Sequence, residues 1–264
     1  MSVKEKVERI RTRALNAEYF LDPLESEILG RPVAQLRNVE VFDGRRALKD
    51  LQRFFDWCAR RQVSLCSCRL PQTQRNEAML LENGGFRWIE LNFHPELNDL
   101  QERNLRNGDI RVAEAEIADR NLLGEMAADA FDFGRFHQDP RLGPAIGKRR
   151  YRHWLENAFE AHHQHVLKCI FNGETIGFFV IERPNGQEIF WSLIGLGRSW
   201  WGRGLGRRAW EAVLLHHQQH GVRRVATSIS SHNVPAFNLY VRLGWRFPPP
   251  LLTFHWCSST GLLE

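Results

Sequence analysis

Hydrophobic positions in the second half of the chain alternate between the period of strands and that of helices. An apolar run at 188–194 is typical of a buried strand, and Leu205, Ala209 and Val213 follow it at helical spacing. A two-residue turn signal, Asn172-Gly173, joins two further apolar runs into a hairpin. The pattern predicts strands at 110–113, 188–196, 222–229 and 251–256 and a hairpin of two strands at 165–182. It predicts helices at 119–131, 148–161, 205–214 and 233–244.

A faint repeat relates the first half of the chain to the second. Aligning residues 63–70 with 222–229 also places Gly85-Phe86 on Gly244-Trp245 without a gap, so helix, strand, helix and a Gly-aromatic pair recur in order. Between the halves lies a polar stretch without an apolar period. We therefore predict two domains, at 1–100 and 109–264; chance similarity of two α/β segments is the alternative.

Alternating glycines form the turn between the strand at 188–196 and the helix that follows. Gly202, Gly204 and Gly206 allow a tight turn whose N–H groups converge on an anion at the positive end of that helix. The spacing fits neither a dinucleotide-binding nor a Walker-type motif, and a plain turn with solvated arginines is the alternative. The residues predicted to surround the anion are Trp201, Gly202, Arg203, Gly204, Leu205, Gly206 and Arg207.

A second motif follows about thirty residues later and, with the turn, resembles the GCN5-related N-acetyltransferase (GNAT) superfamily. The superfamily's pyrophosphate loop, [QR]-x-x-G-x-[GA], corresponds to Trp201–Gly206, and its motif N-x-x-A-x-x-x-Y-x-x-x-G-[FW] to Asn233–Trp245. Trp201 departs from the loop pattern. The resemblance implies an α/β (α+β) fold with a mixed, mostly antiparallel sheet between helices. It also implies that the first half is a degenerate, non-catalytic copy, with Leu81 in the place of the motif tyrosine.

The resemblance implies acetyl transfer from acetyl-CoA to a primary amine by direct attack, without an acyl-enzyme. The loop amides would hold the CoA pyrophosphate, and a backbone N–H near Leu196 would bind the thioester carbonyl. Tyr240 would protonate the departing thiolate, since a phenol with a pKa of about 10 stays protonated at neutral pH. Asn233 either touches the cofactor or only caps its helix.

The acceptor is expected to bind the segment at 133–140 and the helix after it. An R-F-x-x-D/P segment before a Y-x-x-W helix resembles the dTDP-fucosamine acetyltransferase family, which acetylates the 4-amino group of a nucleotide-linked amino sugar. Rings and a guanidinium suit a base and a diphosphate; core packing and a surface ion pair are the alternative. The implied substrate-binding residues are Arg135, Phe136, His137, Asp139, Tyr151 and Trp154.

The residue that accepts the ammonium proton is less defined. Glu188 on the central strand is the candidate base, His137 and Asp139 are further candidates by chemistry alone, and ordered water is the alternative. His216 and His220 share a helix face, but no Glu or Cys ligand lies nearby by spacing, so we expect no metal.

Composition narrows the class of protein. With 264 residues, 43% hydrophobic and 25% charged, the chain is typical of soluble globular proteins. The net charge of +5 would attract polyanions such as CoA, whereas dispersed basic residues without a nucleic-acid motif argue against nucleic acid. Five cysteines without a C-x-x-C pair, and no signal peptide or long apolar run, predict a reduced, cytoplasmic protein that does not bind membranes.

Two other functions stay open. One is acetylation of another small amine or of a protein or peptide amine. The other is a non-catalytic, acyl-CoA-binding regulatory module. The intact Tyr240 argues against such a module, and Trp201 mildly favours it. The oligomeric state is also open, a homodimer included.

Overall fold

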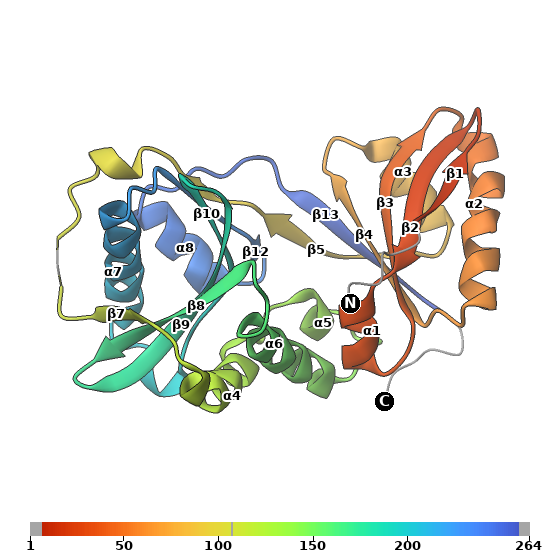
Figure 1. Ribbon diagram of the computed structural model, residues 1–264. Helices are drawn as coiled ribbons and strands as arrows, with labels where there is room; N and C mark the ends of the chain where they lie inside the picture. Colours follow the sequence, from red (N-terminus) through yellow and green to blue (C-terminus); the bar gives the residue numbers. More distant parts are fainter. Residues whose placement is uncertain (1–6, 107, 259–264) are drawn as a thin grey trace. The chain divides into compact units, whose positions relative to one another are not determined.

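The computed structural model describes residues 7–106 and 108–258, and the chain divides into two compact units (Figure 1). Of the described residues, the first unit comprises 7–92, 135–146 and 249–258; the second comprises 93–106, 108–134 and 147–248. The predicted division at 1–100 and 109–264 is therefore interrupted, because two segments of the second half belong to the first unit.

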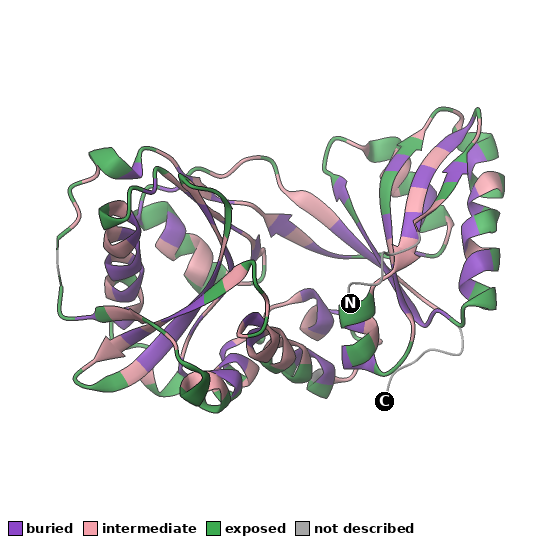
Figure 2. Ribbon diagram, viewed as in Figure 1, coloured by how far each residue is buried: buried purple, intermediate pink, exposed green. Residues whose placement is uncertain are grey.

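The first unit is a sheet with two helices on one face. Its strands follow the order β1-β2-β3-β4-β13-β5, in which β3 and β4 are parallel and joined by α2. Helix α2 is amphipathic: Leu51, Phe54 and Cys58 are buried at helical spacing, and exposed residues follow its other side (Figure 2). The elements are β1 (Glu8–Arg11), β2 (Leu15–Leu21), α1 (Pro23–Leu29), β3 (Val33–Val41), α2 (Gly44–Arg60), β4 (Leu65–Pro71), α3 (Arg75–Asn83), β5 (Arg87–Phe93), α5 (Arg135–Gln138) and β13 (Leu251–Cys257).

Strand β13 lies between β4 and β5 and is antiparallel to both, with Phe254 opposite Cys68 on one side and Trp88 on the other. The sequence predicted a strand at 251–256 as the last of the second domain. The strand forms, but it belongs to the sheet of the first unit. It forms backbone hydrogen bonds with β4 and β5, which would otherwise each have an unpaired edge.

The second unit is a sheet with helices on both faces. Its strand order is β6-β11-β10-β9-β8-β7; each neighbouring pair is antiparallel except β10 and β11, which are parallel and joined by α7. The elements are β6 (Glu96–Leu97), η1 (Leu100–Glu102), β7 (Arg111–Glu114), η2 (Ile117–Asp119), α4 (Arg120–Ala130), α6 (Pro144–Ala158), β8 (Gln164–Phe171), β9 (Glu174–Asn185), β10 (Glu188–Leu196), η3 (Arg198–Trp200), α7 (Leu205–Gln219), β11 (Arg224–Thr227), β12 (Ile229–Ser230) and α8 (Val234–Arg242).

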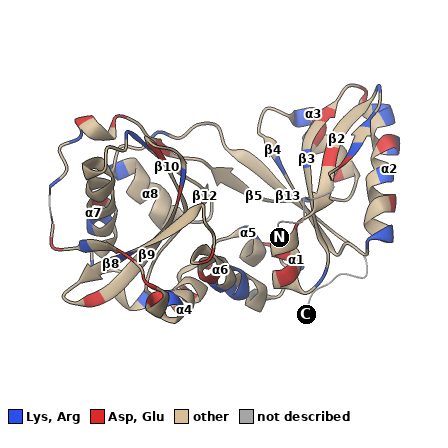
Figure 3. Ribbon diagram, viewed as in Figure 1, with Lys and Arg blue, Asp and Glu red and all other residues tan. Residues whose placement is uncertain are grey.

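Strand β9 is buried on both faces, which explains its continuous apolar run. Phe178 and Val180 pack with α4 and α6, whereas Phe179 and Ile181 pack with α7 and α8, as the alternation of side chains along a strand requires. Basic and acidic residues are interspersed over both units (Figure 3). Within 7–106 and 108–258, none of the helices combines the length and the apolar character needed to span a membrane.

Candidate functional site

Strand β10 leaves its neighbour β11 halfway along its length. The parallel ladder runs from Glu188 opposite Arg224 to Trp191 opposite Thr227. Just beyond it, β10 carries one residue more than β9, because Trp191 is opposite Ile181 and Leu193 is already opposite the next residue, Val180. In a regular strand, residues two apart lie on the same face of the sheet. Because of the extra residue, Trp191 and Leu193 lie on opposite faces: Trp191 packs on the α7 side and Leu193 on the α4 side. Bulges of this kind are common next to active sites.

The bulge and the end of the ladder leave backbone amides at one edge of β10. Gly197 donates its N–H to the Ile176 carbonyl of β9 at 2.9 Å. Because successive amides of a strand point to opposite edges, those of Leu196 and Ile194 point away from β9, along the edge that β11 no longer pairs. The predicted amide near Leu196 therefore has the direction that a carbonyl-binding role requires.

Tyr240 of α8 lies at the end of the same ladder. Its side chain is buried, with the rings of Trp210 and Trp245 edge-on at centroid distances of 6.4 and 4.7 Å. Burial raises the pKa of the phenol, and the Trp210 and Thr227 side chains partly oppose that rise. Thr227 is the last residue of the ladder with Trp191, and its hydroxyl donates to the Trp191 carbonyl at 2.8 Å. The structure thus places a protonated phenol where β10 and β11 separate.

Local sequence explains how α8 holds this phenol. Asn233 caps the helix, since its side-chain oxygen accepts the Ala236 N–H at 3.2 Å. Arg103 covers the other end by donating to the carbonyls of Leu243 and Gly244 at 2.8 and 3.2 Å. Of the two roles predicted for Asn233, the structure shows the capping contact.

The glycine turn presents an uncapped helix start. Gly202 and Gly204 both have φ of +73°, in the left-handed region that favours glycine. Gly204 is the N-cap residue of α7 and has no side chain to cap the helix, so within the described part of the chain the first amides of α7 have no N-cap side chain as a partner. This arrangement suits an anion such as a phosphate.

The equivalent helix start in the first unit is closed. Asp43 caps α2, and its carboxylate accepts the N–H groups of Arg45 and Arg46 at 3.1 and 3.4 Å. A carboxylate of the chain thus takes the position that an anion would need. Leu81, which the alignment places at the Tyr240 position, is fully buried and has no proton to donate.

The side chains of the turn have protein partners of their own. Arg207 pairs with Glu211 at 2.9 Å, and the guanidinium of Arg203 lies 5.0 Å from the centroid of the Trp200 ring. Trp201 is 42% exposed and donates its indole N–H to the Leu196 carbonyl at 2.9 Å. Trp201, the residue that departs from the superfamily pattern, therefore connects the turn to the last residue of β10 by a hydrogen bond.

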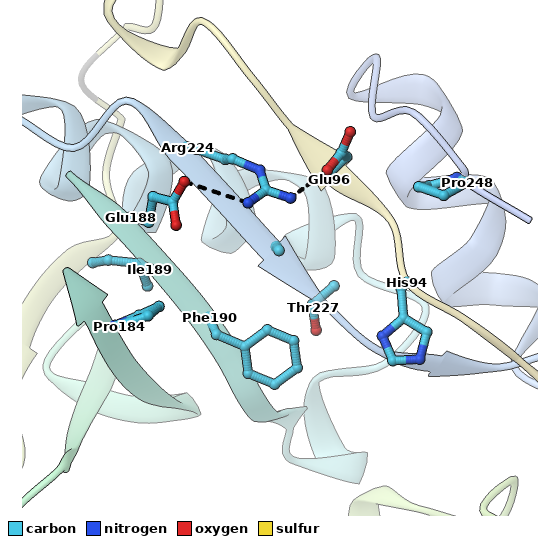
Figure 4. Close-up of a pocket in the computed structure, with 10 residues that line it drawn as sticks. His94, Glu96, Pro184, Glu188, Ile189, Phe190, Arg224, Thr227 and Pro248 are labelled. Atoms are coloured by element: carbon cyan, nitrogen blue, oxygen red, sulfur yellow. Dashed lines mark hydrogen bonds and ion pairs between the residues drawn. The ribbon is translucent and has the colours of Figure 1, made fainter. Parts of the chain in front are cut away.

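A pocket of about 310 Å³ lies on the other half of β10 (Figure 4). Arg224 crosses it, paired with Glu96 at 2.5 Å and with Glu188 at 3.4 Å. The hydrogen bond from Arg224 to Glu96 is the main reason why the pKa of Glu96 is lowered. Phe190, His94, Thr227 and two prolines complete most of the lining. The pocket therefore reaches from Glu188 to the residue beside the Tyr240 phenol.

Glu188 is not next to Tyr240. It is three residues before Trp191, the end of the ladder, which corresponds to roughly 10 Å along the strand. It is eight residues before Leu196, roughly 26 Å. The structure places Leu196 and the glycine turn at the end of β10, Tyr240 near the middle of the strand where the ladder with β11 ends, and Glu188 at its start.

Four of the predicted substrate residues belong to the first unit, whereas Tyr240 belongs to the second: Arg135, Phe136, His137 and Asp139. Arg135 is buried, forms an ion pair with Glu25, and approaches His255 Nε2 with its Nη1 at 3.3 Å. Phe136 packs in an apolar cluster with residues of α1 and β3. His137 lies beside them on α5.

Asp139 completes this buried network. It lies 2.8 Å from His255 Nδ1 and 2.8 Å from Arg141 Nη2. Burial lowers the pKa of His255 to about 4, so the imidazole is neutral at pH 7. Burial alone would raise the pKa of Asp139, but hydrogen bonds from His255 and Arg141 outweigh it and hold that pKa well below its usual range. The charged groups expected to hold a diphosphate thus already have protein partners.

Tyr151 and Trp154 lie on α6 in the second unit. Tyr151 stacks on Phe131 with centroids 4.1 Å apart. The guanidinium of Arg150 lies 5.5 Å from the Tyr151 ring centroid and 4.9 Å from that of Trp154. Both side chains are half-buried at the edge of the α4–α6 core. The six predicted substrate residues are therefore divided between the two units.

Three residues around the phenol were not singled out by the sequence: Trp191, Trp210 and Thr227. Trp191 donates its indole N–H to His217 Nε2 at 2.9 Å, and burial lowers the pKa of His217 to about 3. His217, which is adjacent in sequence to His216, is thus hydrogen-bonded to Trp191 in the core. Among the described residues, no group of three or more His, Cys, Asp or Glu side chains could hold a metal ion. Thr227 could be identified as a site residue only from the pairing of β10 with β11, in which it is opposite Trp191.

Comparison with known proteins identifies related sequences. Residues 129–245 match the acetyltransferase (GNAT) family. The chain is 23% identical over 141 residues to the spore coat polysaccharide biosynthesis protein SpsD of Bacillus subtilis, covering 53% of this chain and 48% of SpsD. It is 35% identical over 74 residues to mycothiol acetyltransferase of Corynebacterium glutamicum, covering 27% and 25%. The chain thus spans about half or less of the length of these relatives.

Solved structures share the fold over most of the chain. A GCN5-related N-acetyltransferase from Sphaerobacter thermophilus is 15% identical with a TM-score of 0.64, covering 91% of this chain and 76% of that one. One from Kribbella flavida is 14% identical with a TM-score of 0.61, covering 96% and 90%. A tandem GNAT protein from the clavulanic acid biosynthesis pathway is 13% identical with a TM-score of 0.59, covering 92% and 79%. These matches confirm the predicted fold class.

Proposed function

Because residues 129–245 match the GNAT acetyltransferase family, we propose that the second unit transfers an acetyl group from acetyl-CoA to a primary amine by direct attack. The observation that carries the proposal is the buried, protonated Tyr240 at the point where β10 leaves β11. The uncapped glycine turn at the start of α7 supports it.

Each part of the site has one task in this proposal. The turn amides bind the CoA pyrophosphate, and the amides of Ile194 and Leu196 stabilise negative charge on the thioester oxygen. The amine nitrogen forms a bond to the carbonyl carbon, the carbon–sulfur bond breaks, and Tyr240 gives its proton to the sulfur. Asp43 and Leu81 in the first unit support the proposal that this half is not catalytic.

For the acceptor we propose an amino sugar carried on a nucleotide, with its amino sugar ring in the pocket of Figure 4. Glu96 and Glu188 share one guanidinium, so one negative charge is left to attract an ammonium group. Phe190 and His94 provide aromatic walls for a ring. A volume of about 310 Å³ is near the lower limit for small-molecule pockets and would hold one ring, leaving the nucleotide outside.

Further support for this acceptor comes from the names of relatives and from α6. SpsD is named for polysaccharide biosynthesis. Tyr151 and Trp154 remain proposed contacts for the nucleotide base, because both are half-buried. Arg135 and Asp139 contribute less to the proposal, since both are engaged in the first unit. Glu188 is the proposed base and, at roughly 10 Å along β10 from Trp191, would take the ammonium proton through water.

The first experiment measures release of free CoA thiol with a panel of nucleotide amino sugars, free amino sugars, polyamines, amino acids and peptides. Tyr240→Phe should lower kcat by about 10²-fold or more and change the Kd for CoA much less, as expected for a lost proton donor. Tyr19→Phe, which removes another buried phenol, is the matched control. Unchanged turnover in Tyr240→Phe refutes the assignment. CoA binding without turnover on any amine would favour the regulatory module instead.

The second experiment tests the acceptor pocket. Glu188→Gln should raise the KM of the preferred amine by about tenfold, because a charged hydrogen-bond partner is lost, lower kcat because the proposed base is lost, and leave the KM of acetyl-CoA unchanged. Glu182→Gln on β9, outside the pocket lining, is the control. A rise in the KM of acetyl-CoA alone contradicts the pocket assignment, and no turnover with any nucleotide sugar removes the leading acceptor.

A further inference from the structure

We propose that Trp210 is a positioning residue for the proton donor: its indole N–H stabilises the phenolate that forms when Tyr240 protonates the leaving thiolate. The inference rests on the proposed role of Tyr240. It concerns a side chain of α7 that lies outside both sequence motifs and acts on the substrates only through the Tyr240 phenol.

The indole N–H of Trp210 acts on the Tyr240 phenol but is not engaged in a short hydrogen bond before the reaction. It is buried, and within the part of the chain that the structure describes its Nε1 has no hydrogen-bond partner. Its ring meets that of Tyr240 edge-on, with 6.4 Å between centroids and an angle of 68° between planes. A buried donor without an acceptor destabilises a protein. Such a donor is useful when negative charge develops beside it, because it needs no reorganisation at that moment.

The other polar groups near the phenol are less suited to this role. Thr227 has one hydroxyl proton, and it donates that proton to the Trp191 carbonyl at 2.8 Å. The Trp245 ring lies nearer to Tyr240, with its centroid at 4.7 Å, and its Nε1 also lacks a partner among the described residues. Trp245, however, is not among the side chains that act on the titration of the phenol, whereas Trp210 lowers its pKa, as a donor to the phenolate would.

The proton transfer balances without a further reactant apart from water. The O–H bond of Tyr240 breaks and an S–H bond forms on the departing thiol, while the electron pair of the O–H bond stays on the phenol oxygen. Trp210 keeps its proton and donates a hydrogen bond to that oxygen. The phenolate regains a proton from water after the product has left.

Two substitutions separate this role from packing. Trp210→Phe keeps a ring and removes the N–H; Trp245→Phe makes the same change in a second buried indole that also meets Tyr240 edge-on. We expect Trp210→Phe to lower kcat by about tenfold, because a donor that shifts the pKa of the phenol by about one unit stabilises the phenolate by that factor, with an unchanged KM for acetyl-CoA. Trp245→Phe should stay within about threefold of the parent protein. Thermal unfolding of both variants shows whether a lower kcat reflects a loss of folded protein.

A spectroscopic measurement isolates the phenol itself. A fluorinated tyrosine incorporated at position 240 has a more acidic phenol, whose ionisation is followed by its absorbance. Trp210→Phe should raise that pKa by about one unit, a tenfold change in acidity, and Trp245→Phe should not. Equal shifts in both variants, or no shift in either, overturn the inference. If Tyr240→Phe loses activity and Trp210→Phe does not, the inference fails alone; if Tyr240→Phe keeps full activity, the proposed role of Tyr240 fails with it.

Discussion

The same substitution, glycine to alanine, should have opposite effects at two positions of the turn. At Gly204, φ is +73° and no atom lies within 4 Å of an added Cβ. The change therefore costs only the left-handed conformation of alanine, about 1–2 kcal/mol. Gly206 lies inside α7, and an added Cβ would meet Leu196 and Leu239 at 3.8 and 3.9 Å, which is ordinary contact. Alanine should stabilise the helix there by up to about 1 kcal/mol.

Thermal and urea unfolding measure these differences. With about 2–4 °C per kcal/mol for a chain of this size, Gly204→Ala should lower Tm by about 2–8 °C, and Gly206→Ala should raise it by up to about 4 °C. Gly204→Asn should lie between the parent and Gly204→Ala, because asparagine adopts the left-handed conformation more readily. A change of the same sign at both glycines would refute the backbone argument.

Calorimetric binding of CoA tests whether the strained turn is the anion site. A Gly204→Ala turn that relaxes in the free protein must return to the left-handed conformation when CoA binds, and about 1.4 kcal/mol of strain corresponds to a tenfold higher Kd. Gly206→Ala keeps the backbone and should bind with nearly the parent Kd. Equal CoA binding by all variants would mean that the turn amides do not hold the pyrophosphate.

Three further predictions concern stability and packing. Arg135→Met removes the cation that is paired with the buried Glu25 and should destabilise the protein by about 3–5 kcal/mol in urea unfolding; unchanged stability with a higher acceptor KM would instead support the substrate role inferred from sequence. Burial lowers the pKa of His255 to about 4 and of His217 to about 3, so between about pH 6.5 and 4 the unfolded chain binds protons that the folded one does not. The free energy of unfolding should therefore fall as pH is lowered through that range, and equal or greater stability at pH 4.5 than at pH 7.5 would contradict this. Gly177→Ala would bring a Cβ within 2.6 Å of the Gly195 carbonyl and of Leu196, and should cost about 1–3 kcal/mol and weaken CoA binding; Gly186→Ala, with no atom within 4 Å, is its control.

Local backbone requirements were readable from the sequence. Asn172-Gly173 has φ of 51° and 83°, as a two-residue hairpin turn requires, and Gly204 has the left-handed conformation that its position in the turn suggested. Asn233 caps α8, which is one of the two roles that the sequence left open for it. Such features depend on a residue and its immediate neighbours, so a single sequence contains the information. The positions of Tyr240 as a site residue and of Leu196 as the carbonyl-binding amide remain predictions that the strand geometry supports.

Long-range partners decided the rest. Arg135 and Asp139 looked like ligand-binding groups, but their partners Glu25 and His255 lie more than 100 residues away along the chain, and only folding brings these charges together. Strand β13 was predicted as a strand, yet its place between β4 and β5 depends on which edges need a partner. The sequence by itself determined the glycine turn, the caps and the order of elements, because these follow from local conformation and hydrophobic period. The tertiary structure alone determined which charges are neutralised and where β10 leaves β11, because both depend on neighbours that are remote in sequence.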